Sequence, residues 1–215
     1  HYGRGIDRAR ALGVRPNITV HHFSSPLWLD DLRRAPGPCT PSDTDLWMFL
    51  SSAGGLTAGR VDPEGALFPY ETMDRLHEAH AQTGPITLVR ARRAGGPEQR
   101  WQPFHPEAED PALERNLYKN LIGNRVVFEE IHRGLGLAFR YRWSACDALG
   151  HVRTATLENL GDDAVDITLL DGLRNLLPHG VALPLYQASS VLVDAYKRMD
   201  VDAATGLATC ALTAH

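Results

Sequence analysis

The feature that most constrains this chain is a series of short segments, between residues 45 and 173, rich in alternating apolar and polar residues. In the clearest of them, GLAFRYRWSAC, large apolar residues alternate with Ala138, Arg140 and Arg142; the apolar residues are Leu137, Phe139, Tyr141 and Trp143. Because successive side chains of a strand point to opposite faces, this spacing puts the large apolar groups on one face and the arginines on the other. We therefore predict that these four apolar residues lie in a core.

Six further segments are separated from one another by Gly, Asn, Asp or Pro: residues 45–52, 54–62, 86–93, 124–132, 151–160 and 164–173. Several short strands at such spacing predict an antiparallel sandwich rather than βαβ units. The last two flank a Gly-Asp-Asp turn, and we expect them to form a hairpin. Helices are expected over 70–80 and 184–199. The second should carry an apolar stripe and end with Lys197 and Arg198 in its last turn; the stripe consists of Leu185, Ala188, Leu192 and Ala195.

The chain divides into three parts by composition. The pattern of residues 1–29 predicts a helix, a turn and a strand. Residues 30–44 contain three prolines among charged residues. Residues 45–215 contain the predicted strands named above. We expect an αβ segment, a Pro-rich linker and a sandwich domain in that order. Both ends are typical of a sequence cut within an element, and we expect the sandwich domain to be truncated at its C-terminus.

Charge and cysteine usage exclude several classes of function. The net charge is −4 and the pI about 6.2, whereas nucleic-acid-binding domains usually have a basic face. The three cysteines are far apart and odd in number, which favours a reducing compartment and a cytoplasmic location. No run of eighteen apolar residues is present, so no membrane partner is expected. His77 and His80 have the wrong spacing for a zincin motif, and we expect neither a metal nor another cofactor.

The stretch ITVHHFSSPLWL, residues 18–29, resembles a strand end of retaining β-glucosidases, which fold as TIM barrels. The resemblance implies that His22 binds sugar and that Phe23 forms a pocket wall. A histidine with no ligand at a strand end explains the same residues. The family also needs two catalytic glutamates, but no Asn-Glu-Pro segment is present, and Glu158 matches the family's nucleophile motif only loosely. A barrel of about 250 residues exceeds the chain.

Residues 38–215 resemble a second group, the β-supersandwich region that precedes the helical-barrel catalytic domain in cellobiose-phosphorylase-like proteins. The resemblance is carried by the segments from PCTPSDTDLWMFLSS to RLHEAH and from GNRVVFEEIH to NLLPHGV. It implies a mainly β, antiparallel, galactose-mutarotase-like supersandwich, with the αβ segment in front and a helix near the C-terminus. The general acid of such proteins lies on the helical barrel, so no catalytic residue carries over to this chain.

Aromatic and charged residues gather between positions 45 and 71, among them Trp47, Arg60 and Tyr70. Sugar sites combine stacking rings with hydrogen-bonding groups, because each buried hydroxyl must be paired; interdomain surfaces are enriched in the same residue types. The sequence thus predicts a non-catalytic, substrate-flanking or structural domain of a large glycoside phosphorylase or hydrolase. Its expected partners are an oligosaccharide and an adjacent catalytic domain of the same polypeptide. Two alternatives remain open: a β-glucosidase fragment that supplies a glucose-binding strand, and a carbohydrate-binding module that uses Trp47 and Tyr70.

Overall fold

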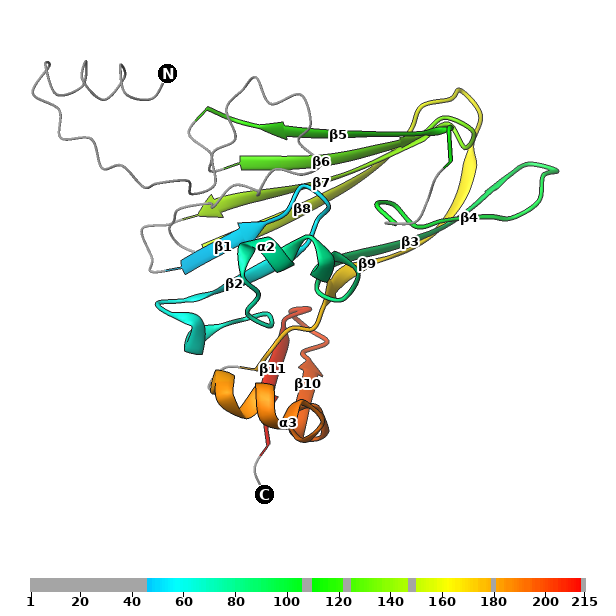
Figure 1. Ribbon diagram of the computed structural model, residues 1–215. Helices are drawn as coiled ribbons and strands as arrows, with labels where there is room; N and C mark the ends of the chain where they lie inside the picture. The colour runs from blue at the N-terminus through cyan, green and yellow to red at the C-terminus, as the bar shows by residue number, and fades with distance from the viewer. Residues whose placement is uncertain (1–45, 106–109, 122–124, 147–149, 179–180, 214–215) are drawn as a thin grey trace, which may run out of the picture.

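The computed structural model describes residues 46–105, 110–121, 125–146, 150–178 and 181–213 (Figure 1). The predicted αβ segment and linker, and with them His22 and Phe23, lie outside the described residues. The described chain is mainly β-strand, and all seven pairings between its named strands are antiparallel. The prediction of a mainly β, antiparallel chain is confirmed.

The larger sheet has four strands in the order β5-β6-β7-β8. Its strands are β5 (Leu113–Lys119), β6 (Arg125–His132), β7 (Leu137–Cys146) and β8 (Gly150–Asn159). Along β7, the predicted inner residues are almost completely buried, with exposed fractions of 1%, 0%, 2% and 3% for Leu137, Phe139, Tyr141 and Trp143. Arg140 and Arg142 point to the other face, as the alternation predicts.

The smaller sheet has the order β4-β3-β9 and consists of β3 (Gly84–Arg93), β4 (Gln99–Trp101) and β9 (Val165–Arg174). The prediction that β8 and β9 form a hairpin is wrong. The turn between them is present, held by Asn159 Nδ2, which donates to the Asp163 carbonyl at 2.8 Å. After the turn, however, the chain crosses to the other sheet and pairs with β3, from Arg93↔Val165 to Gly84↔Arg174.

A hairpin of β1 (Leu46–Leu50) and β2 (Leu56–Arg60) completes the core. Buried side chains from this hairpin and from the inner faces of both sheets form one hydrophobic cluster, which includes Met48, Val89, Trp101, Phe128 and Tyr141. A short segment with η1 (Pro63–Gly65), α2 (Met73–Leu76) and η2 (Glu78–Ala81) links β2 to β3. The helix expected over 70–80 is thus only one short turn followed by a 3-10 turn.

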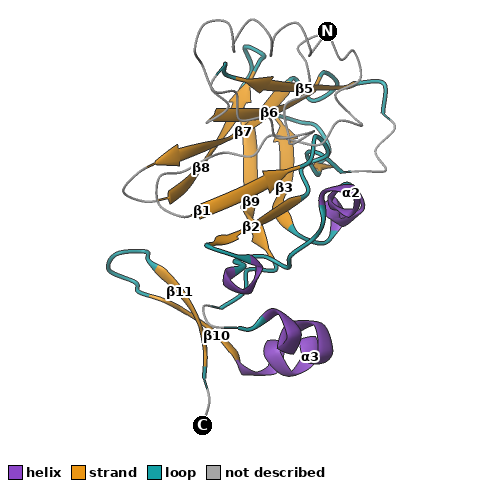
Figure 2. Ribbon diagram, turned by 60° about the vertical axis from the view of Figure 1, so that its left-hand side comes forward, coloured by secondary structure: helices purple, strands orange, loops and turns teal. Residues whose placement is uncertain are grey.

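The last described part of the chain lies apart from the two larger sheets in both views (Figures 1 and 2). It contains α3 (Leu183–Tyr196) and a hairpin of β10 (Lys197–Val201) and β11 (Ala208–Leu212). Lys197 and Arg198 begin β10, so their predicted place in the last helical turn is wrong.

The apolar stripe predicted along this helix is exposed, and its buried residue is instead Val193. Ser189 has non-helical angles (φ −147°, ψ 47°), and this kink separates the first half of the stripe from the second. The helical period therefore does not hold across it. Within the described ranges, no helix combines the length and the apolar character needed to cross a membrane.

Candidate functional site

The structure brings together two of the sequence-predicted site residues, Trp47 and Tyr70. Their rings meet edge to face with centroids 5.9 Å apart, and the ring of Phe49 lies 5.7 Å from Trp47. All three are partly exposed. Trp47 and Phe49 come from one face of β1, because they are two residues apart, while Tyr70 lies in the loop before α2. We call Trp47, Phe49 and Tyr70 the aromatic surface.

The backbone of β2 fixes the position of the Trp47 ring. Trp47 pairs with Gly59, and a Cβ at Gly59 would lie 2.3 Å from Cζ2 of Trp47. Only glycine leaves room for the indole to lie across this strand. Arg60, the third predicted residue of the group, pairs with Leu46 at the next position. It is exposed and belongs to the opposite face of the hairpin, so the structure does not bring it to the aromatic surface.

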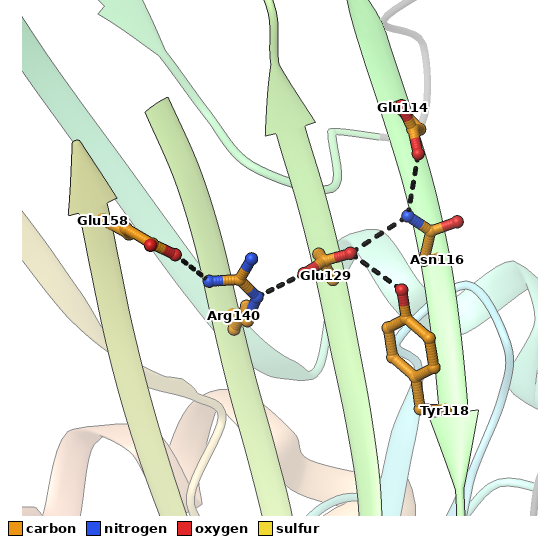
Figure 3. Close-up of polar contacts among 6 residues, drawn as sticks. All are labelled: Glu114, Asn116, Tyr118, Glu129, Arg140 and Glu158. Atoms are coloured by element: carbon orange, nitrogen blue, oxygen red, sulfur yellow. Dashed lines mark hydrogen bonds and ion pairs between the residues drawn. The ribbon is translucent and has the colours of Figure 1, made fainter. Parts of the chain in front are cut away.

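The outer face of the four-stranded sheet carries a ladder of polar side chains (Figure 3). Its centre is Glu129 on β6, which accepts hydrogen bonds from Asn116 Nδ2 and from the Tyr118 hydroxyl, each at 3.0 Å. Arg140 on β7 donates to Glu129 and also to Glu158 on β8. The ladder thus crosses all four strands.

The electrostatics of this ladder fit a structural role. Burial alone raises the pKa of Glu129, but the hydrogen bonds from Arg140, Asn116 and Tyr118 outweigh it, and its pKa is lowered. A glycosidase general acid needs the opposite shift, so that it holds a proton near neutral pH. Glu158, the loose match to a nucleophile motif, is occupied by Arg140. We therefore interpret these carboxylates as ion-pair partners within the sheet.

Sequence reasoning missed a second feature, a cavity of about 180 Å³ between the two sheets. Its walls come from four separate segments: the β1–β2 turn (Ala53 and Gly54), the end of η2 (His80 and Ala81), the start of β3 (85–87) and the loop after β4 (102–105). Tyr141 on β7 and Arg174 on β9 complete it. No sequence pattern joins residues so far apart in the chain.

Tyr141 is an almost fully buried side chain that lines the cavity. Its ring stacks on Phe128 at 4.7 Å and meets Phe104 edge to face at 5.2 Å, which confirms the prediction that it is a core residue. Its hydroxyl has no hydrogen-bond partner among the described residues. Burial raises the pKa of this hydroxyl far above its ordinary value, so Tyr141 is a neutral donor and acceptor at physiological pH.

A buried glutamate holds one wall of the cavity in place. Glu130 on β6 is fully buried and accepts from Trp101 Nε1 at 2.7 Å, from the Phe104 backbone N–H at 2.9 Å and from Arg115 Nε at 2.6 Å. Phe104 has a φ of 62°, a conformation that is unfavourable for a bulky side chain. The hydrogen bond from its N–H to Glu130 stabilises that conformation and positions the loop after β4.

A second carboxylate, which is partly buried, connects the two sheets behind the cavity. Asp171 on β9 binds both terminal nitrogens of Arg153 on β8, at 2.6 and 2.8 Å, and accepts from the Thr87 hydroxyl at 2.7 Å. The Arg153 guanidinium lies 5.0 Å from the centroid of the Tyr141 ring. Burial raises the pKa of Asp171, but the hydrogen bonds from Arg153 and Thr87 have the larger effect. The pKa of Asp171 is therefore lowered.

In the described part of the chain, no three His, Cys, Asp or Glu residues are grouped so that they could hold a metal ion. His77 and His80, considered above for zinc, lie in and beside the 3-10 turn η2. The His80 ring contacts the His77 carbonyl through Nδ1, so Nδ1 carries the proton in this contact because a carbonyl can only accept. This contact is local to η2, which lies at the edge of the cavity.

Comparison with known proteins adds no assignment to this geometry: no family model matches the chain, and no curated protein sequence matches it either.

Proposed function

We propose that this chain is a non-catalytic, substrate-flanking and structural domain of a large carbohydrate-active enzyme, a glycoside phosphorylase or hydrolase. In this proposal, the two antiparallel sheets belong to a galactose-mutarotase-like supersandwich. The observation that carries the proposal is the aromatic surface, where Trp47 and Tyr70 form an edge-to-face pair that is partly open to solvent. Partly exposed rings of this kind offer apolar faces to the C–H groups of a pyranose, with a phenol oxygen beside them for a hydroxyl.

The exposed apolar side chains of α3 and of the β10–β11 hairpin, including its turn, support the structural part of the proposal. The largest exposed fractions are 81% for Val191, 68% for Val201 and 64% for Leu207, and Met199 and Leu192 are about half exposed. Large apolar groups gathered on one small unit mark an interaction surface. The adjacent catalytic domain of the same polypeptide is the partner that we propose for it.

This apolar unit also separates the proposal from its main alternative, a free-standing carbohydrate-binding module that uses the same two rings. Such a module needs only the aromatic surface and has no use for an exposed apolar unit at the other end of the chain. The aromatic surface favours both functions, whereas the apolar unit favours a domain that packs against a neighbour.

The test is binding of cello-, malto- and xylo-oligosaccharides to the purified chain, measured by isothermal titration calorimetry. Trp47→Ala should weaken binding about tenfold or more, as expected for loss of a central aromatic contact. Tyr196→Ala is the matched control, because Tyr196 is a 48% exposed aromatic on α3, away from the aromatic surface, and it should leave the affinity unchanged. The proposal is wrong if no oligosaccharide binds, if both variants bind like the parent chain, or if the chain alone cleaves glycosides.

A further inference from the structure

The cavity between the sheets has the features of a binding site distinct from the aromatic surface. Its volume of about 180 Å³ is several times the ~30 Å³ that one water molecule occupies in the liquid. It is also smaller than the roughly 300 Å³ at which sites for drug-sized ligands begin. A single small ring therefore fits this space, and a chain of sugars does not.

The hydroxyl of Tyr141 points to a polar ligand. The side chain is 2% exposed and lines the cavity, and its oxygen has no hydrogen-bond partner among the residues described. The hydroxyl oxygen is not one of the fully buried side-chain atoms that lack a partner, so it can be reached from the cavity. A ligand or water in the cavity must supply that partner. The neighbouring Thr87 hydroxyl already donates to Asp171, so its oxygen is left as an acceptor at the same wall.

The remaining walls combine apolar and polar surface. Pro85, Ile86, Pro103 and Phe104 provide apolar contacts, while Gln102 adds an amide and His80 an imidazole. The lining residues include no aspartate or glutamate, so a cationic ligand has no counter-ion. Among the lining residues the formal charge is on Arg174, whose two terminal nitrogens donate to the carbonyls of Ala81 and His80, at 2.6 and 3.2 Å. Its Nε is buried and has no partner among the described residues. This chemistry disfavours a cation and suits a molecule that has both hydroxyl groups and C–H faces.

We propose that this cavity binds one monosaccharide ring, with the Tyr141 hydroxyl and the Thr87 oxygen paired to its hydroxyl groups and Phe104 against its C–H face. The choice of a sugar among hydroxyl-bearing ligands rests on the proposed function. The site itself rests on the geometry of the cavity alone.

The substitution Tyr141→Phe tests this site without removing a hydrogen bond among the described residues. It keeps the ring that stacks on Phe128 and lies under Arg153, so the fold should persist with unchanged or slightly higher stability. The probe is D-glucose, titrated into the ¹⁵N-labelled full chain. Saturable shifts are expected for the backbone amides of Gly54, Thr87 and Phe104, and Tyr141→Phe should weaken the apparent affinity about two- to tenfold, the value of one hydrogen bond.

Two further variants make the result decisive. Ala53→Leu places a larger apolar side chain at the cavity wall and should abolish the shifts. It replaces Tyr141→Phe as the test if that variant does not fold. Trp47→Ala should leave the glucose shifts unchanged. The proposed function, which is tested by oligosaccharide binding at the aromatic surface, and the cavity site can therefore be refuted separately. The proposal is overturned if glucose causes no saturable shift at these amides, since the cavity then holds only water, or if neither Tyr141→Phe nor Ala53→Leu reduces binding.

Discussion

The ion pair between Arg153 and Asp171 should be one of the strongest single contributions to stability between the two sheets. The side chains are 10% and 19% exposed and meet through two short hydrogen bonds. Removing one partner of a buried pair leaves an uncompensated charge and typically costs about 3–5 kcal/mol. This pair is partly exposed, and Asp171 would keep its hydrogen bond from Thr87. We therefore expect Arg153→Met to lower the free energy of unfolding by an amount near the lower limit, about 3 kcal/mol.

The measurement is urea unfolding followed by tryptophan fluorescence. The midpoint urea concentrations of the variant and the parent chain are compared, and an unchanged m-value shows that the difference is one of stability. A loss of this size should lower Tm by about 6–12 °C in a chain of this length. The matched control is Arg92→Met, which breaks an Arg–Asp pair between β3 and β9 whose side chains are 62% and 81% exposed. Such a surface pair contributes about 0–1 kcal/mol. If Arg153→Met is no more destabilising than Arg92→Met, the Arg153–Asp171 pair does not stabilise the contact between the sheets.

The pH dependence provides a second check on this pair. Because the pKa of Asp171 is lowered in the folded state, its contribution to stability is complete above the ordinary aspartate pKa of about 3.9 and is lost as the pH falls through the lowered value. The penalty for Arg153→Met should therefore be constant near neutral pH and shrink in acid. Combining it with Asp171→Asn at pH 7 should recover part of the loss, since no uncompensated charge then remains. A penalty that persists at acid pH would contradict the assignment.

Two other substitutions test how the candidate sites are positioned. Glu130→Gln replaces an acceptor of three hydrogen bonds by an amide, so we expect the free energy of unfolding to fall by about 2–4 kcal/mol. Hydrogen exchange at the Phe104 amide should become faster. Exchange rates like those of the parent chain would argue against a role of Glu130 in holding the loop. Gly59→Ala places a Cβ 2.3 Å from the Trp47 ring and should cost about 1–3 kcal/mol and change the near-ultraviolet circular dichroism of Trp47. Gly172→Ala, with no atom within 4 Å of the added Cβ, is its control, and equal effects of the two would refute the packing argument.

The strands that could be predicted from the sequence are those with a strong apolar period. Strand β7 alternates over four large apolar residues, and the structure buries all four. Strands β4 and β5 were not predicted, because β4 has only three residues and β5, LERNLYK, is mostly polar with partly buried side chains. Apolar alternation identifies a strand only where one of its faces reaches the core.

Strand pairing was less predictable than strand position. The Gly-Asp-Asp turn after β8 is compatible both with a hairpin and with a crossing to the second sheet. The choice depends on β3, some seventy residues earlier in the chain, whose ten residues each find a partner in β9. Local turn chemistry carries no information about such a distant strand. The same limit explains why Trp47 and Tyr70 could be predicted as a group, being close in sequence, whereas the cavity residues could not.

The buried carboxylate of Glu130 and the partly buried carboxylate of Asp171 explain why the cavity persists between the sheets. Glu130 on the larger sheet binds Trp101 and Phe104, which belong to β4 and the loop after it, and Asp171 on the smaller sheet binds Arg153 of the larger one. Apolar residues at these positions would often make the protein as stable or more stable. They would not, however, fix the distance between the two sheets. Charged hydrogen bonds instead specify direction and distance. The cavity beside Tyr141 is therefore a specified part of this fold, and the same contacts that cost desolvation energy give it a fixed shape.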